Sequence, residues 1–357
     1  MSNSKYEKYF TKLNSNLKKF NNKFLYYIPN IYKRDLRKDE LFESKFKFHF
    51  LENFLYPDYL CKDINKIKNA KLCFISHYVG NKNRDKNIDF YYGDLLKKKN
   101  IKIPFYLLLI NHTDEKLEDI ESKFKNSKIT RVYVDNKFGF ISDLSIFFKI
   151  TKEYLLFQIS KFKNSKKIIS LNKMKITLNY KDFLSSRYTY RISNRVFKIL
   201  NISNKLSNLV ATYEGHAYEK IIFNYCNKNN IKSFGYFFSV IREYKNSVYY
   251  NFLNYDPDVI LTSGTVAKKD LKVYLPNKDI QVLGGNKKVS KKSYSNKSYK
   301  NIKKKATILV CPEGIYSETI KLFELINNEK LISNKFQFIF RVHPDLNSSD
   351  IFKKKLF

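Results

Sequence analysis

The sequence predicts an α/β protein with two Rossmann-like halves, the second of them incomplete, behind a helical N-terminal extension. Short apolar runs that end in small or polar residues recur along the chain, as buried parallel strands do. Stretches of helical period separate these runs, and this alternation is typical of a parallel sheet covered by helices. The chain has 357 residues, 43% of them hydrophobic, which is enough for two domains of ordinary size.

The first 285 residues contain the extension and the first Rossmann-like domain. Residues 1–68 are rich in lysine and aromatic residues without a strand period, so they predict a helical extension or partly ordered peripheral packing. The domain itself is expected over 69–285. Its expected strands are 71–76, 103–110, 130–135, 208–213, 231–238, 256–264 and 280–285, and its expected helices are 90–99, 114–126, 141–159, 185–206, 214–229 and 265–275.

The remaining residues form a linker and a partial second domain. Residues 286–305 are polar, low in complexity and lysine-rich, which predicts an inter-domain linker or exposed loop. Residues 306–357 supply two strands, within 306–314 and 336–345, and a helix over 317–328. A doubly wound sheet needs about four strands to bury both faces. This half therefore either packs on the first domain as an appendage or belongs to a truncated sequence.

The formal charge of +35 points to an anionic partner but does not favour nucleic acid. The lysines are spread along the whole chain, as the AT-rich codons of Lys, Asn, Ile, Phe and Tyr would produce. No zinc-finger spacing, RNP-like aromatic motif or glycine-rich clamp accompanies them. Loose peripheral contact with an anionic membrane face is favoured over a nucleic-acid groove.

The compartment is expected to be cytoplasmic. The four cysteines are not paired at metal-binding spacing, which fits a reducing environment. The first ten residues lack the apolar core and cleavage site of a secretory signal. The longest apolar run, residues 105–110, is far short of the roughly 20 residues that cross a bilayer.

Glu214 and His216 are the main catalytic candidates of the first half, because they follow the expected strand over 208–213. Ligands of open α/β sheets bind at the carboxyl ends of strands, where Glu214 can act as general base and His216 can assist it or bind phosphate. The structural alternative is an acidic residue that favours the helix macrodipole. Glu219 is expected to be an ordinary carboxylate of the helix surface.

Three weaker candidates line the same expected cleft. His77, His112 and Ser263 each follow an apolar strand of the first half. A single histidine in such a place also serves as a hydrogen-bonding loop residue, so each of these positions keeps a structural alternative.

The second half offers candidates for phosphate binding. Arg341 and His343 alternate along one strand and share one side of it before Pro344, an arrangement that suits a diphosphate or monophosphate. Their structural alternative is to cap a neighbouring helix. Glu313 and Ser317 lie at a strand-to-helix turn whose N–H groups suit phosphate or ribose hydroxyls, although Ser317 also suits an N-cap.

Several common active-site motifs are absent from the sequence. It contains no Walker loop, no GxGxxG after a strand, no GxSxG elbow, no HExxH and no DxD-like motif in a suitable loop. ATPases, dehydrogenases and serine hydrolases are disfavoured accordingly, and neither a metal site nor a tightly bound cofactor is expected.

A set of short stretches over about residues 70–357 carries a family resemblance. They are FISHYVG (74–80), DFYYGDLLKKKN (89–100), YLLLINHT (106–113), ATYEGHAYEKIIF (211–223), DPDVILTSG (256–264), CPEG (311–314) and FRVHPD (340–345). As a set they resemble a bacterial surface-carbohydrate biosynthesis family with a GT-B-like glycosyltransferase architecture. The resemblance implies two Rossmann-like domains, an acceptor-side domain followed by a nucleotide-sugar-side domain.

Two elements are more distantly similar to those of bacterial sialyl- and polysialyltransferases. These are the acidic-Gly element at Glu214 and the His-Pro element at His343. The resemblance implies Glu214 as base and His343, with Arg341 beside it, as ligands of the phosphate of a CMP-sugar. The chain departs from that pattern in lacking a second acidic residue after Glu214 and in its short second half.

The resulting expectation is an inverting, metal-independent glycosyltransferase without a cofactor. It would move a sugar from a nucleotide-sugar donor to a glycan or lipid-linked glycan of lipopolysaccharide, O-antigen or capsule. Two alternatives stay open: a non-catalytic or truncated member of the same fold, and a basic nucleic-acid-binding protein.

Overall fold

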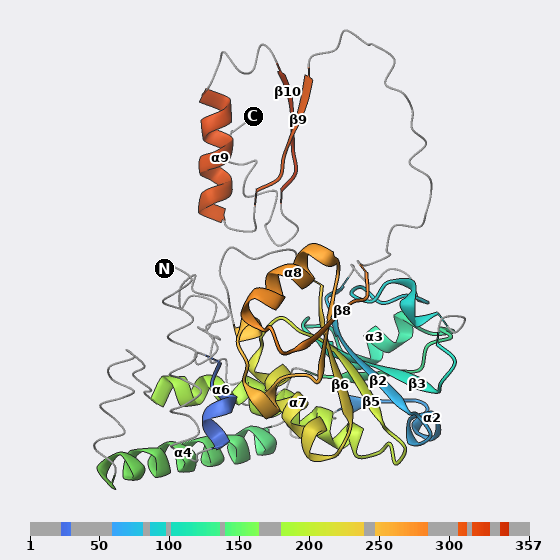
Figure 1. The fold of residues 1–357 in the computed structure, drawn as a ribbon, viewed down its shortest axis with the longest axis vertical. Helices are drawn as coiled ribbons and strands as arrows, with labels where there is room; N and C mark the ends of the chain where they lie inside the picture. Colours follow the sequence, from blue (N-terminus) through green and yellow to red (C-terminus); the bar gives the residue numbers. More distant parts are fainter. Residues whose placement is uncertain are drawn as a thin grey trace. The chain divides into compact units, whose positions relative to one another are not determined.

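The computed structural model of the chain describes ten segments, and every structural statement below refers to them (Figure 1). They are residues 23–29, 59–80, 86–97, 101–135, 140–163, 180–238, 247–284, 306–312, 316–328 and 336–342. The chain forms two compact units, Met1–Ser290 and Lys291–Phe357, which are described separately.

The first unit is built on an eight-stranded sheet of order β1-β4-β3-β2-β5-β6-β7-β8. The strands are β1 (Tyr59–Leu60), β2 (Leu72–Tyr78), β3 (Phe105–Asn111), β4 (Arg131–Val134), β5 (Asn208–Thr212), β6 (Lys232–Phe237), β7 (Val259–Thr262) and β8 (Asp279–Val282). β1 pairs antiparallel with β4, and every other pairing in this sheet is parallel. The predicted α/β class with a mostly parallel sheet is thus confirmed.

Helices connect these strands. They are α2 (Ile64–Lys68), α3 (Leu117–Lys123), α4 (Phe140–Lys163), α6 (Tyr180–Leu200), α7 (Ala217–Lys228) and α8 (Thr265–Tyr274), with short 3-10 helices η1 (Lys23–Tyr27), η5 (Asp94–Leu96), η6 (Ser247–Tyr249) and η7 (Leu253–Tyr255). The expected helical extension is corrected at β1, because these two residues pair with β4 as a strand.

The helix expected over 90–99 is also corrected, because η5 is the only helical element in residues 90–97, the described part of that range. The Asp89 carboxylate accepts hydrogen bonds from the backbone N–H groups of Tyr91 and Tyr92, at 2.8 and 2.9 Å. Such local side-chain bonds offer the backbone a turn in place of a helix. Gly93, with φ +57°, then takes a left-handed conformation that a regular helix does not contain.

The two faces of the sheet bury separate apolar clusters. Side chains alternate along β2, so that Cys73 and Ile75 enter the larger cluster while Leu72 and Phe74 enter the smaller one. Residues from α4, α6, α7 and α8 fill the larger cluster. Residues from α3, together with Tyr92, fill the smaller cluster. Both faces of the parallel sheet are therefore covered, as strands apolar on both sides require.

The pairing of β2 with β5 sets the position of the candidate site. The chain proceeds from β2 to β3 and β4 on one side, and returns after α4 and α6 to place β5 on the other side. Leu72 pairs with Asn208 and Ile75 with Ala211 in parallel register. Strand order reverses between these two strands, and ligands of open α/β sheets bind outside the carboxyl ends of strands at such a switch point.

The second unit, as far as it is described, is one βαβ motif. β9 (Ala306–Val310) pairs in parallel with β10 (Phe336–Phe340), and α9 (Tyr316–Asn328) connects them. Val310, Ile320 and Phe323 form its small buried cluster.

We predict that Gly235→Ala destabilises the first unit. A Cβ at this β6 position would lie 2.7 Å from Pro257 Cγ and 3.0 Å from Tyr213 Cγ, so backbone or ring must shift. Overpacking of this kind lowers the free energy of unfolding by about 1–3 kcal/mol. Chemical denaturation of the variant and of the unaltered chain would measure this difference. Gly264→Ala is the matched control, because its Cβ would meet nothing within 4 Å. Equal stability of the two variants would contradict this packing.

Candidate active site at the switch point

Three of the five histidines of the chain meet at the carboxyl ends of β2, β3 and β5. His77 lies in β2, His112 follows β3, and His216 precedes α7. The ring centroid of His77 is 4.8 Å from that of His112 and 6.4 Å from that of His216. Residues from three separate strand ends, with Glu214 among them, are thus brought together beside the switch point.

A continuous hydrogen-bonded relay joins two of these rings to two hydroxyl groups. The Tyr188 hydroxyl lies 3.3 Å from Nδ1 of His112, whose Nε2 lies 2.8 Å from Nδ1 of His77. His77 Nε2 in turn lies 2.8 Å from the Thr212 hydroxyl. His77 and Thr212 are buried, whereas His112 is exposed. The relay therefore joins a solvent-exposed imidazole to a buried hydroxyl group of β5.

The contact between the two imidazole rings limits their charge. A hydrogen bond between His112 Nε2 and His77 Nδ1 requires one nitrogen to donate and the other to accept. An imidazolium has no acceptor nitrogen, so the intact pair holds at most one extra proton. This arrangement can take up or release a single proton during a reaction.

Glu214 and His216 form the second part of the site. The Glu214 carboxylate lies 4.0 Å from Nε2 of His216, and the two side chains are 14% and 24% exposed. The His216 ring stacks on Tyr218 with centroids 4.9 Å apart, and Tyr218 lies 6.2 Å from the His77 ring. A partly accessible carboxylate beside an imidazole is suited to accept a proton from a substrate hydroxyl.

The Glu219 carboxylate holds the turn that carries Glu214 through backbone hydrogen bonds. This carboxylate is 1% exposed, which corrects the expectation of an ordinary carboxylate on the helix surface. It accepts the backbone N–H groups of Glu214, Gly215 and His216, at 3.0, 2.8 and 2.9 Å. Donors that precede a helix lack intrahelical partners, and Glu219 satisfies three of them at once. The positions of Glu214 and His216 are thereby fixed.

The next residue of α7, Lys220, is fully buried. Its Nζ donates to the Tyr213 hydroxyl at 2.6 Å, to the Asp256 carboxylate and to the Ser247 carbonyl at 3.3 Å. Burial lowers the pKa of Lys220, while the charge of Asp256 opposes that shift. The ion pair fastens the start of α7 to residues 247–256.

Asp89 is a further buried carboxylate at the end of β2. Besides its two backbone donors it accepts the Ser76 hydroxyl at 2.9 Å. Its Oδ2 has no hydrogen-bond partner among the described residues, and burial raises the pKa of the Asp89 carboxyl. The turn that it shapes presents Tyr91, whose ring lies 5.4 Å from His77. Asp89 therefore positions one aromatic wall of the site.

The other expected residues are not joined to this cluster by the described contacts. Ser263 follows β7 at the same carboxyl edge, but β6 lies between β7 and β5. Arg341 directly follows β10 and is exposed, and Ser317 is exposed in the first turn of α9. Glu313 and His343 lie outside the described residues, so the pairing of Glu214 with His343 stays a prediction.

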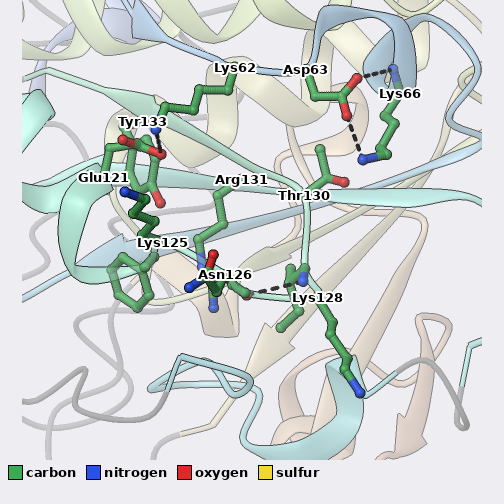
Figure 2. A pocket seen from close by; sticks show the side chains of 13 residues that line it. Lys62, Asp63, Lys66, Glu121, Lys125, Asn126, Lys128, Thr130, Arg131 and Tyr133 are labelled. Atoms are coloured by element: carbon green, nitrogen blue, oxygen red, sulfur yellow. Dashed lines mark hydrogen bonds and ion pairs between the residues drawn. The ribbon is translucent and has the colours of Figure 1, made fainter.

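An open groove of 260 Å³ lies at the other end of the sheet, where β4 begins (Figure 2). Its walls come from residues 62–66 and 121–133 and contain none of the candidate residues. Three of its basic side chains have local partners: Lys62 pairs with Glu121 at 2.6 Å, Lys66 with Asp63 at 2.5 Å, and the Arg131 guanidinium lies 4.3 Å from the Phe124 ring centroid. The groove therefore lies apart from the candidate residues, which meet at the switch point.

Among the described segments, no group of three or more His, Cys, Asp and Glu side chains is arranged to hold a metal ion. The histidines at the switch point instead use ring nitrogens in the relay. The residues that sequence reasoning missed are Tyr188, Tyr218, Thr212, Asp89 and Tyr91. Of these, Thr212 could have been predicted from the sequence, because it ends the strand before Glu214 and strand ends are where ligands bind.

We predict that Lys220→Met lowers the unfolding free energy by about 3–5 kcal/mol, because it leaves the Asp256 carboxylate buried without its cation. The double variant with Asp256→Asn is expected to recover much of this loss. Lys123→Met is the control, since it removes a surface partner of Glu115 and should have a far smaller effect. Denaturant titrations of the three variants measure this, and a loss in the double variant as large as in Lys220→Met would refute the pairing.

Comparisons with known proteins identified no relative of this chain. No protein-family model, curated protein or solved structure matches the chain. Its function is therefore argued from the residues that meet at the switch point.

Proposed function

We propose that the chain is a glycosyltransferase that moves a sugar from a nucleotide-sugar donor to a surface glycan, with Glu214 as the base. The observation that carries the proposal is the meeting of the Glu214–His216 pair with the His77–His112 relay beside the switch point. A carboxylate base, assisting imidazoles and a ligand crevice are what transfer to a hydroxyl acceptor requires.

In the proposed reaction, Glu214 accepts the proton of an acceptor hydroxyl. The acceptor oxygen forms a bond to the anomeric carbon of the sugar while the bond from that carbon to the donor phosphate breaks. The electron pair of the broken bond leaves with the nucleotide, and attack from the opposite side inverts the anomeric carbon. His216, whose Nε2 lies 4.0 Å from the carboxylate, is the assisting imidazole in this reaction.

A hydrolase that uses Thr212 as nucleophile is less consistent with the geometry. Thr212, His77 and His112 are hydrogen-bonded in the order of a nucleophile, a base and an orienting group. However, Thr212 is 1% exposed and belongs to β5, so a substrate carbonyl has no access to its hydroxyl. The relay is better suited to proton exchange than to covalent catalysis.

The donor side belongs to the second unit in this proposal. Arg341, with His343, would offset the charge that develops on the leaving phosphate of a CMP-sugar or another nucleotide-sugar. Glu313 and Ser317 would contact the nucleoside. This assignment takes the two units as a GT-B-like pair that works without a metal ion, and it follows from the family resemblance.

The proposed acceptors are lipopolysaccharide, O-antigen or capsule glycans at the cytoplasmic face of the membrane. The formal charge of +35 supports peripheral contact with an anionic leaflet. A non-catalytic member of the fold remains the rival function, and it differs in binding no donor.

We predict that Glu214→Gln lowers the rate of nucleotide release from the donor by about 10²–10⁴-fold, the usual contribution of a general base. The donor is first found by thermal shift with CMP-, UDP- and GDP-sugars, because a ligand of the native state raises the melting temperature. Donor binding should persist in the variant, since the base contacts the acceptor.

Glu118→Gln is the matched control, because Glu118 is an exposed carboxylate on α3. It should leave release unchanged. Full activity of Glu214→Gln would exclude this residue as the base, and the absence of a thermal shift with every nucleotide-sugar would favour the non-catalytic rival.

A further inference from the structure

Helix α4 has two apolar sides, and one of them is anchored in the core. Ile146, Ile150 and Phe157 are buried in the larger cluster of the first unit. Phe157 packs against Phe183 of α6 with ring centroids 5.3 Å apart, and the Thr151 hydroxyl is 3.0 Å from that of Tyr180. α4 therefore lies fixed along α6 (Figure 1).

The other side of α4 exposes large apolar side chains. Phe148 is 63% exposed and Leu155 is 54% exposed. The apolar stripe consists of Leu144, Phe147, Phe148, Leu155, Leu156 and Ile159. Four of them, at positions 144, 148, 155 and 159, recur at helical spacing and share one side of the helix. Large exposed apolar side chains gathered on one side of a helix are typical of an interaction site.

The charged side chains of α4 indicate which kind of partner the apolar stripe would contact. Lys149 and Lys152 are exposed on α4 itself. Along the sequence, residues 149–181 contain nine lysines and one acidic residue, Glu153. Exposed lysines on a helix that also exposes Phe, Leu and Ile suit a partner that offers both anionic groups and an apolar phase. An anionic lipid surface offers both, whereas nucleic acid offers no apolar phase for the stripe.

The length and composition of α4 fit a helix that lies on a bilayer. None of the helices in the described segments is long and apolar enough to cross a membrane. Amphipathic helices with aromatic and leucine residues on one side, and lysines near it, bury that side at the level of the headgroups. Because its inner side is anchored against α6, α4 would bind without leaving the fold.

We propose that α4 is the membrane-docking element of this chain and that its apolar stripe inserts into the headgroup region of anionic bilayers. The inference goes beyond the proposed transfer reaction and does not depend on it. Glu214→Gln should bind lipid as the unaltered chain does, so the two proposals can fail separately.

The chain contains no tryptophan, which provides a direct test. Leu155→Trp places a unique fluorophore on the stripe, and Val273→Trp places one at an exposed position of α8 as control. With vesicles of phosphatidylglycerol and phosphatidylcholine, the emission of Leu155→Trp should shift to the blue and that of Val273→Trp should not. Phosphatidylcholine vesicles alone should leave both unchanged, because the anionic charge is missing.

A second test removes the stripe. The triple variant Phe148→Ser, Leu155→Ser and Ile159→Ser should weaken co-sedimentation with the anionic vesicles by roughly tenfold or more. The matched double variant Val266→Ser and Val273→Ser, on α8, should sediment normally. Equal binding of the two variants would overturn the proposal. So would a fluorescence shift of Leu155→Trp that depends on protein concentration without lipid, which would identify the stripe as a contact between copies of the chain.

Discussion

Two consecutive buried charges at the start of α7 hold the candidate site in place. Glu219 gathers the N–H groups of the turn that carries Glu214 and His216, and Lys220 ties the same turn region to Asp256. A buried charge that loses its partners costs several kcal/mol, so neither contact is easily given up. The turn is thereby organised by the chain's own contacts, and rigid support of this kind is what the proposed base, Glu214, would need to act at a fixed distance.

Much of the fold follows from patterns visible in the sequence. The apolar runs that contain β2, β3 and β5 are short, flanked by polar residues and separated by helical stretches, so their strand state was predictable. The exceptions have local causes. η5 replaces a longer helix because the Asp89 carboxylate bonds to the backbone N–H groups of the two residues after Phe90. β1 is only two residues long, too short to show any period.

The site was predictable in its parts and not as an assembly. The rule that ligands meet strand ends identified Glu214, His216, His77 and His112 one by one. Their convergence depends on β2 lying next to β5, a fact of sheet order that no local pattern contains. Tyr188 could not be predicted for another reason. A tyrosine in an amphipathic helix has the sequence pattern of an ordinary core residue, and only the structure shows that its hydroxyl contacts His112.

The distant pairing of β2 with β5 also has a consequence for biosynthesis. One edge of β2 is covered by β3 soon after it leaves the ribosome, but the other edge waits until α4 and α6 have been translated and β5 emerges. An open edge of a parallel strand is a template for unwanted pairing between nascent chains. The order of translation thus leaves the β5-facing edge of β2 open until the residues of β5 have been synthesised, and β6, β7 and β8 can add to the sheet only after that.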